Sequence, residues 1–332
     1  MKKLLSEHAV TRRQTLALFG AGLATAAFAR PAWAAGYPER FITFIVPFAP
    51  GGPTDVMARV VAGPLGEALG QSVVIENRPG AGGNIGIGVA AKSAPDGYTF
   101  LLTSTAFVVN PSLYKSVPYE IKDFVPISNL GTSPNVFVAT PASGITSVAD
   151  LVKKAKAEPG KLSYASPGAG TSAHLSFELF KKNAGIDIVH IPYSGAGPAI
   201  QGILGNQVQL ASAAVPPVLP HIRAGKLVAI GETGAKRWPD LPDTPSLVEA
   251  GYPAVVTENF QALFAPKGTP QPVLDKILST ATEVLNRPDI KDKLAKAGFG
   301  VIASTPAELQ AIVDKEVPMW RELVKSTGTS AD

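Results

Sequence analysis

The chain has 332 residues, of which 45% are hydrophobic and none is cysteine, and its formal net charge is +4. The lack of cysteine excludes disulfides, thiol catalysis, cysteine-ligated metal sites and a lipid-modified N-terminal cysteine. A chain of this length exceeds what one hydrophobic core usually supports, so we expect two lobes.

Residues 1–34 have the pattern of an export signal. Four basic residues precede an apolar stretch over residues 15–28, and Ala32-Trp33-Ala34 has the small residues that signal peptidase requires. The pair Arg12-Arg13 favours the twin-arginine route, with the general secretory route as the alternative. A membrane anchor is disfavoured, because a span needs about 20 apolar residues and this stretch is shorter and interrupted by glycines.

Removal of this signal changes the charge of the chain. It takes away five of the 30 basic residues and one of the 26 acidic residues, which leaves 25 of each. A neutral mature chain gives no reason to expect nucleic acid or an anionic membrane as a partner. We therefore predict an exported, periplasmic protein.

The first part of the mature chain has a repeating strand, turn and helix pattern. Short apolar runs alternate with amphipathic stretches and with turns rich in Gly and Pro, which is typical of a parallel α/β sheet. The predicted strands are residues 41–48, 73–76 and 98–103, and the predicted helices are residues 54–69 and 85–92.

A second set of the same units follows. Its predicted strands are residues 136–139, 162–165, 188–191, 207–211 and 227–231, and its predicted helices are residues 147–157 and 172–184. The chain ends with a strand at residues 259–265 and helices at residues 272–286, 288–297 and 306–326. Because residues 136–139 and 259–265 flank the second set, we predict an inserted lobe, residues 138–258. Residues 35–137 and 259–332 form the other lobe, and two crossing segments act as the hinge.

Each predicted lobe has one Gly-rich turn between a strand and a helix. These turns are residues 48–55 (FAPGGPTD) and residues 166–174 (SPGAGTSAH). In an open parallel sheet, ligands bind at the carboxyl ends of the strands. The N–H groups of a first helical turn carry about half a positive charge, so such a turn binds anions without Lys or Arg. Two facing turns suit a carboxylate ligand, with one carboxylate at each end.

Six motifs in chain order carry a family resemblance. They are YPERFITFIVPFAPGGPTDVMAR from Tyr37, VVIENRPGAGGNIG from Val73, SAPDGYTFLL from Ser93, YASPGAGTSAHL from Tyr164, PHIRAGKL from Pro220 and LPDTPSLVEAG from Leu241. The series resembles the substrate-binding proteins of tripartite tricarboxylate transporters, the Bug family, over essentially the whole mature chain.

The resemblance implies a fold, a function and a set of site residues. The fold is a two-lobed periplasmic binding protein of type II, whose lobes close like a Venus flytrap over a small carboxylic acid and deliver it to membrane transporter subunits. We expect a monomer without enzymatic activity, cofactor or metal. The ligand-binding positions that match are Phe48, Ala49, Gly51, Gly52, Thr54, Asp55, Ser104, Ser166, Gly168, Gly170, Thr171, His174, Tyr193 and Asn259.

The sequence gives less information about which carboxylic acid is bound. An acid that is common in the relatives is missing near Gln209, which disfavours a ligand with an amine. The small apolar run Ala213, Ala214 and Val215 and the aromatic Phe107, Tyr193 and Phe260 are predicted to line a roomy, flat cleft. The hypothesis is a di- or tricarboxylate, either of medium length or aromatic, such as a phthalate-type acid.

Alternative interpretations exist for the residues and for the function. Asp55 also suits a helix cap, the loop glycines suit tight turns, and His174 and Tyr193 suit packed core positions. At the level of function, the alternatives are an exported carboxylate-processing enzyme and a carboxylate sensor for a signalling partner. The signatures of serine hydrolases and P-loop enzymes do not occur in the sequence.

Overall fold

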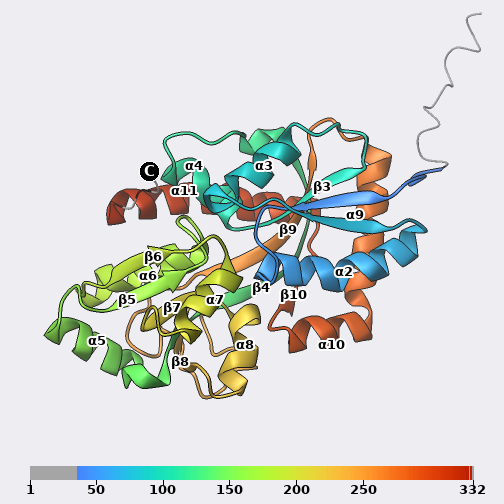
Figure 1. Ribbon diagram of the computed structural model, residues 1–332. Helices are drawn as coiled ribbons and strands as arrows, with labels where there is room; N and C mark the ends of the chain where they lie inside the picture. The colour runs from blue at the N-terminus through green and yellow to red at the C-terminus, as the bar shows by residue number, and fades with distance from the viewer. Residues whose placement is uncertain (1–35, 329, 331–332) are drawn as a thin grey trace, which may run out of the picture. The chain divides into compact units, whose positions relative to one another are not determined.

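The computed structural model describes residues 36–328 and 330 (Figure 1). The residues from Pro38 onward form one compact unit, here called the second unit. The predicted export signal, residues 1–34, lies outside the described residues. Among the described helices, none combines the length and apolar character that a membrane span requires.

A ten-stranded sheet runs through the described part of the second unit. The main strand order is β2-β1-β3-β9-β4-β7-β5-β6, and β8 and β10 also pair with β4. The strands are β1 (Ile42–Val46), β2 (Val73–Asn77), β3 (Thr99–Ser104), β4 (Phe124–Ala139), β5 (Ser163–Ser166), β6 (Val189–Pro192), β7 (Leu210–Ala214), β8 (Val228–Glu232), β9 (Glu258–Pro266) and β10 (Gly300–Val301). Strands β1 to β3 are parallel, as are β5 to β7, and β4 and β9 run antiparallel to their neighbours.

Strand β4 joins two halves of this sheet. Its first part pairs with β9 and β10, whereas its last five residues, Asn135 to Ala139, pair with β7 and β8. We call β1, β2, β3, β9, β10 and the first part of β4 the first half-sheet. Strands β5 to β8 and the end of β4 form the second half-sheet. The strand predicted at residues 136–139 is thus only the end of a longer strand.

The chain crosses back to the first half-sheet after β8. At this crossing the N–H of Thr233 donates to the carbonyl of Asn135, and the N–H of Thr257 donates to the carbonyl of Thr233. The two connections between the halves therefore lie side by side and share hydrogen bonds. The exact lobe boundaries stay a prediction.

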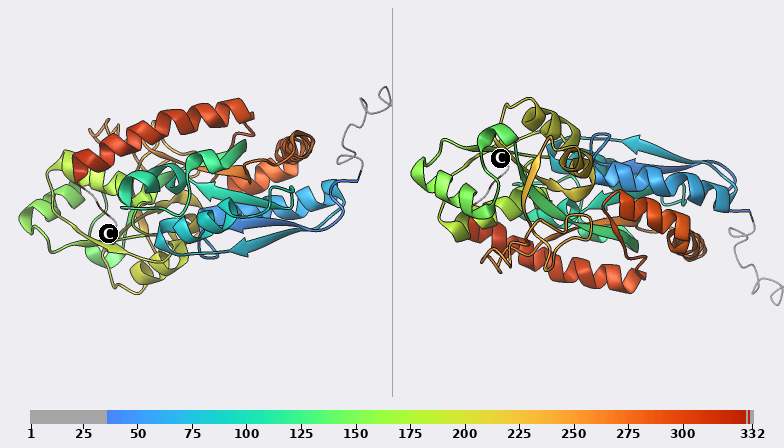
Figure 2. Two further views of the ribbon diagram at one scale, coloured as in Figure 1. Left: turned by 90° about the horizontal axis from the view of Figure 1, so that it is seen from above. Right: turned by 90° about the horizontal axis from the view of Figure 1, so that it is seen from below.

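Helices cover both faces of both half-sheets (Figures 1 and 2). On the first half-sheet, α2 (Pro53–Leu69), α9 (Gln271–Asn286) and α10 (Pro288–Lys296) lie on one face, and α3 (Asn84–Ala91), α4 (Ala106–Leu113) and α11 (Pro306–Thr327) lie on the other. On the second half-sheet, α5 (Val148–Ala157) and α6 (Ser172–Ala184) face α7 (Ala196–Leu204) and α8 (Val215–Arg223) across the strands. Helix α11 runs along one side and contacts α4 and also α6.

Three of these helices, α4, α7 and α8, have no counterpart among the predicted elements. Prolines conceal all three: α8 begins Val-Pro-Pro and also contains Pro220, α7 begins Ala-Gly-Pro, and α4 contains Pro111. Proline is tolerated in the first turn of a helix, because that turn has no internal acceptor for its N–H groups. A sequence interpretation in which every proline ends a helix therefore misses short helices of this kind.

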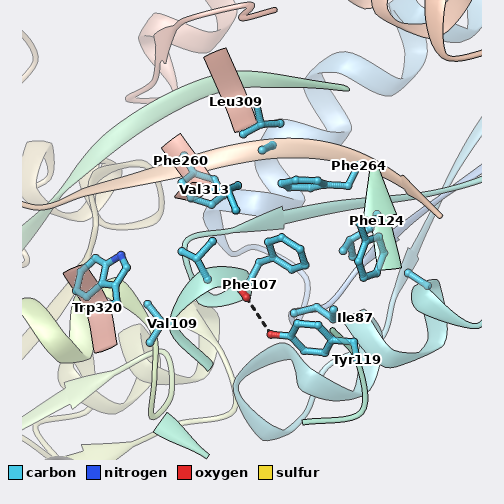
Figure 3. Close-up of a cluster of buried hydrophobic side chains, with 14 of the residues drawn as sticks. Ile87, Phe107, Val109, Tyr119, Phe124, Phe260, Phe264, Leu309, Val313 and Trp320 are labelled. Carbon is cyan, nitrogen blue, oxygen red and sulfur yellow. Dashed lines mark hydrogen bonds between the residues drawn. The ribbon is translucent and has the colours of Figure 1, made fainter. Parts of the chain in front are cut away.

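An aromatic cluster fills the space between the first half-sheet and α3, α4 and α11 (Figure 3). The ring of Phe107 lies 4.7 Å from that of Phe264 and stacks on that of Tyr119 at 5.7 Å. Phe107 is 0% exposed and Phe260 is 3% exposed, and both belong to this cluster. The prediction that Phe107 and Phe260 line a cleft is therefore wrong. Side chains alternate along a strand, and Phe260 points to the face opposite Asn259.

Alternation also organises the second half-sheet. Phe137 and Ala139 of β4 join the cluster beneath α5 and α6, whereas Val136 and Val138 join the cluster beneath α7 and α8. Both faces of the strand are buried, which explains why this stretch of the sequence is continuously apolar.

Candidate ligand-binding site

A pocket lies between the two half-sheets and is lined from both. Its cavity volume is about 30 Å³. Its lining residues are Phe48, Gly52, Pro53, Thr54, Ser104, Asn135, Pro167, Thr171, Ser172, Ala173, Gly195, Ala196, Ala214 and Asn259. Six predicted site residues are thus brought together here: Phe48, Gly52, Thr54, Ser104, Thr171 and Asn259.

Four helices begin at the wall of this pocket. The residues that precede them are Gly52 for α2, Thr171 for α6, Gly195 for α7 and Ala214 for α8, and all four are lining residues. The first N–H groups of a helix have no partner within the helix, and they form its positive pole; α8 offers fewer of them, because Pro216 and Pro217 have no N–H. None of the lining residues is charged. Backbone dipoles therefore dominate the local field, and this field attracts an anion.

The loop ahead of α2 is held in shape by Asp55. This residue is 1% exposed, and its carboxylate accepts hydrogen bonds from the Gly51 N–H at 2.9 Å and from the Asn77 side chain at 3.0 Å. It also pairs with Arg59 at 2.8 Å. Burial acts to raise the pKa of Asp55, but the hydrogen bonds from Arg59, Gly51 and Asn77 outweigh it and lower the pKa. Asp55 thus braces the loop and is not one of the pocket-lining residues.

The loop ahead of α6 is braced by two histidines. The Thr171 hydroxyl accepts a hydrogen bond from the backbone N–H of His174 at 3.3 Å. The backbone N–H of Gly170 donates to the ring Nδ1 of His174 at 3.2 Å. The His174 ring stacks on that of His190 at 4.0 Å, and Nε2 of His190 lies 2.7 Å from the Ser166 hydroxyl. The structure therefore places His174 and Ser166 behind the loop, in packed positions.

Both imidazoles are neutral at ordinary pH. Burial, assisted by the charge of Lys181, lowers the pKa of His174 to about 4. Burial and the neighbouring His174 lower the pKa of His190 to about 3. The brace of this loop therefore carries no charge in the range where the protein is expected to act.

A smaller group of predicted residues lies around a neighbouring cavity of about 130 Å³. Gly168 and Tyr193 line this cavity together with the Gly80 to Gly83 turn. Phe48 and Pro167 line both cavities and so separate them. The Tyr193 hydroxyl donates to the Gln207 side chain at 3.1 Å, which holds the ring at the cavity edge.

Close contacts between the halves surround the pocket. A Cβ atom at Gly195 would lie 2.9 Å from Cβ of Ala49, and one at Gly170 would lie 2.6 Å from Oδ1 of Asn110. These glycines allow loops of the second half to rest against the first half. The predicted residues Ala49, Gly51 and Gly170 therefore shape the rim without lining the pocket.

One lining residue, Asn135, was missed by the sequence reasoning. Asn135 sits where β4 passes from one half to the other, and its amide bonds to the Ser172 hydroxyl at 3.3 Å. Ala214, which was predicted to line the cleft, lines this pocket and precedes the proline-rich α8, whose start the Pro216-Pro217 pair could have marked. No sequence pattern near Asn135 indicates that this residue lines a pocket. Within the described residues, no group of His, Asp and Glu is placed to hold a metal ion.

Comparison with known proteins gives consistent matches. A profile of the family described as "Tripartite tricarboxylate transporter family receptor" matches residues 57–329. Protein BugT of Bordetella pertussis is 40% identical over 316 residues, which is 94% of this chain and 97% of BugT.

Two solved structures match with their ligands. A protein of R. palustris solved with adipate is 34% identical, with a TM-score of 0.86 over 89% of this chain and 99% of that chain. MatC from Rhodopseudomonas palustris with bound malate is 30% identical, with a TM-score of 0.82 over 87% of this chain and 100% of that chain.

Proposed function

The chain belongs to the tripartite tricarboxylate transporter receptor family and is a periplasmic solute-binding protein, and on this premise we propose that it captures a small aliphatic dicarboxylate. It acts as a monomer and passes this acid to the membrane subunits of the transporter. The observation that carries the proposal is the convergence of four helix N-termini on a pocket without charged side chains.

The polarity of the pocket selects the class of ligand. Without a lining Asp or Glu, an ammonium group has no partner, and a buried unpaired charge is costly. Helix N-termini satisfy carboxylates instead. Since α2 belongs to the first half and α6, α7 and α8 to the second, a ligand with a carboxylate at each end contacts both halves.

The apolar part of the pocket supports an aliphatic chain between the two carboxylates. Phe48, Pro167, Ala173 and Ala196 supply apolar surface to the wall. Phe107 and Phe260, which were predicted to form an aromatic wall, lie in the core instead. The relatives solved with adipate and with malate both hold aliphatic dicarboxylates, which supports the same class for this chain.

Ligand-driven closure is the proposed mechanism. The two lobes, residues 35–137 with 259–332 and residues 138–258, turn about the paired crossings near Asn135 and Thr257. A ligand stabilises the closed arrangement only through contacts that the open arrangement lacks. Contacts from both halves to one dicarboxylate form only in the closed arrangement. The transporter recognises this closed form.

Calorimetry with the mature protein tests the proposal. We expect one unsubstituted or hydroxylated dicarboxylate of four to eight carbons to bind with a micromolar Kd, which corresponds to about 8 kcal/mol. Citrate, phthalate and aspartate serve as tricarboxylate, aromatic and amine-bearing comparators. Tight binding of aspartate, or no binding by any dicarboxylate, contradicts the proposal. Consumption of the bound acid during incubation would favour the carboxylate-processing enzyme instead.

Delivery is tested separately, in cells. A deletion strain of the source bacterium is expected to lose uptake of the acid that calorimetry identifies, and a plasmid copy is expected to restore it. Normal uptake in the deletion strain would remove the transport role but leave the binding role intact.

A further inference from the structure

A row of polar side chains lies on one face of the first half-sheet, beneath the start of α2. Gln261 on β9 pairs with Ser104 on β3, and Asn259 on β9 pairs with Ser133 on β4. Paired residues of antiparallel strands point to the same face. The intervening Phe260 points to the opposite face, into the aromatic cluster. The four polar side chains therefore share the face that α2 covers.

Helix α2 places Thr54 above this row. Thr54 and Met57 are three residues apart and so lie on one side of the helix. That side faces the strand pair: a Cβ atom at Gly131, which pairs with Gln261, would lie 3.0 Å from Cε of Met57. Thr54, Ser104 and Asn259 line the pocket. Gln261 thus lies next to Ser104, one step below the pocket floor.

The row and Thr54 above it contain several unpartnered polar atoms. Gln261 is 0% exposed, yet neither its amide oxygen nor its amide nitrogen has a hydrogen-bond partner. The hydroxyls of Thr54 and Ser133 are likewise buried and unpartnered. These are four of the nine buried side-chain atoms without a partner in the described part of the chain. Buried polar groups are nearly always satisfied, so a partner is expected to enter from the pocket.

The chemistry of this partner follows from the amide. A glutamine side chain offers N–H donors and a carbonyl acceptor, and hydroxyl groups do both as well. A carboxylate only accepts, so it would leave the amide oxygen of Gln261 unsatisfied. A neutral hydroxyl-type oxygen donates and accepts at once, and it needs no charged partner.

We propose that Gln261, Thr54 and Ser133 form a subsite for a neutral oxygen that both donates and accepts hydrogen bonds, below the floor of the pocket. This oxygen is either a hydroxyl group carried by the ligand or a water molecule that bridges the ligand to Gln261. The proposal rests on the carboxylate pocket proposed above. It makes Gln261 a residue that determines specificity, because the subsite separates hydroxylated from unsubstituted dicarboxylates.

Two acids and two variants distinguish the sources of the oxygen. Calorimetry compares succinate with malate for the unchanged protein, for Gln261→Leu and for Gln271→Leu, an exposed glutamine on α9 that serves as the matched control. If the ligand supplies the hydroxyl, Gln261→Leu weakens malate binding about tenfold and leaves succinate unchanged. If water bridges, both acids weaken by a similar factor. If Gln261→Leu binds both acids as tightly as the Gln271→Leu control does, the proposal is overturned.

A ligand-free crystal structure shows whether the subsite exists, independently of any affinity measurement. We expect an oxygen at about 3 Å from the Gln261 amide and from the Thr54 hydroxyl. A Gln261 amide that bonds only to protein atoms overturns the proposal, whatever the affinities. If the unchanged protein binds neither acid nor any other dicarboxylate, the proposed function fails, and this structure still decides whether the subsite exists.

Discussion

The loop ahead of α2 and the loop ahead of α6 present N–H groups to the same pocket, but opposite chemistry holds them in place. The first loop is braced by charge, since the buried Asp55 carboxylate binds Gly51, Asn77 and Arg59. The second is braced by neutral rings, since His174 accepts from Gly170 and stacks on His190.

This difference has a consequence for anion binding. An unpaired carboxylate at the start of α2 would compete with the ligand for the positive end of the helix. Arg59 neutralises Asp55, so the first loop keeps a strong brace without repelling an anion. The second loop avoids the conflict because its brace has no charge. The two loops should therefore respond differently to substitution and to pH.

The largest expected effect is at the rim of the second loop. In Gly170→Val the new side chain collides with Asn110 and Leu113 of the first half, and Gly170 has φ +83, which a β-branched residue rarely adopts. We expect a loss of affinity of about 100-fold, or about 3 kcal/mol, by calorimetry.

A matched control separates this contact from backbone strain. Gly185→Ala changes a glycine with φ +61 and no neighbour within 4 Å, so it should cost about 1 kcal/mol of stability and no affinity. Similar affinity losses in both variants would show that strain, not contact between the halves, is responsible.

The pH dependence of stability comes next in size. His174 and His190 have pKa values lowered to about 4 and about 3, whereas unfolded histidines titrate near 6.5. The unfolded chain therefore binds more protons below pH 6.5, and the two histidines lower stability as pH falls toward 4. The slope approaches about 1 kcal/mol per pH unit for each histidine.

Urea denaturation from pH 7 to pH 5 measures this slope, and His190→Gln should remove about half of the histidine contribution. Affinity for the ligand should stay constant from pH 8 to pH 5.5, because neither brace changes its protonation there. A tenfold change in affinity over that range would contradict the neutral brace.

Asp55→Ala tests the charged brace of the first loop. Removal of the carboxylate leaves Gly51, Asn77 and Arg59 without their acceptor, and we expect a loss of about 2 kcal/mol in unfolding free energy and a several-fold weaker ligand. Asp289→Ala breaks an exposed pair with Arg287 and should cost under about 0.5 kcal/mol. An Asp55→Ala variant as stable as Asp289→Ala would show that the first loop needs no brace.

An effect of opposite sign comes from Glu232, a 0% exposed carboxyl near the crossing to the first half. Burial raises its pKa to about 7, although its hydrogen bond from the Trp238 N–H acts to lower it. An acid with a raised pKa in the folded state loses stability as pH rises from about 4.5 to 7. This trend opposes that of the histidines. Glu232→Gln should gain about 3 kcal/mol of unfolding free energy at pH 8 and nothing at pH 4, and it should make the histidine slope steeper. An equal change at both pH values would exclude titration as the cause.

The family motifs and the local punctuation of the chain could be interpreted before the structure was known. Residues 172–184 were predicted as a helix and form α6, because Thr171 at its start and Gly185 at its end are local signals. The two Gly-rich turns and their helices were likewise predicted from adjacent residues. The resemblance to the Bug family was confirmed by the comparisons.

Partners distant in sequence decided the rest. Asp55 and His174 lie in the predicted loops, but Asn77 and His190 determine that their side chains turn away from the pocket. The face of Gln261 is set by its pairing with Ser104, more than 150 positions earlier in the chain. Caps and turns depend on residues a few positions apart, so the sequence alone determines them. Which face a strand residue presents, and what it meets there, depends on register and packing, so only the tertiary structure decides it.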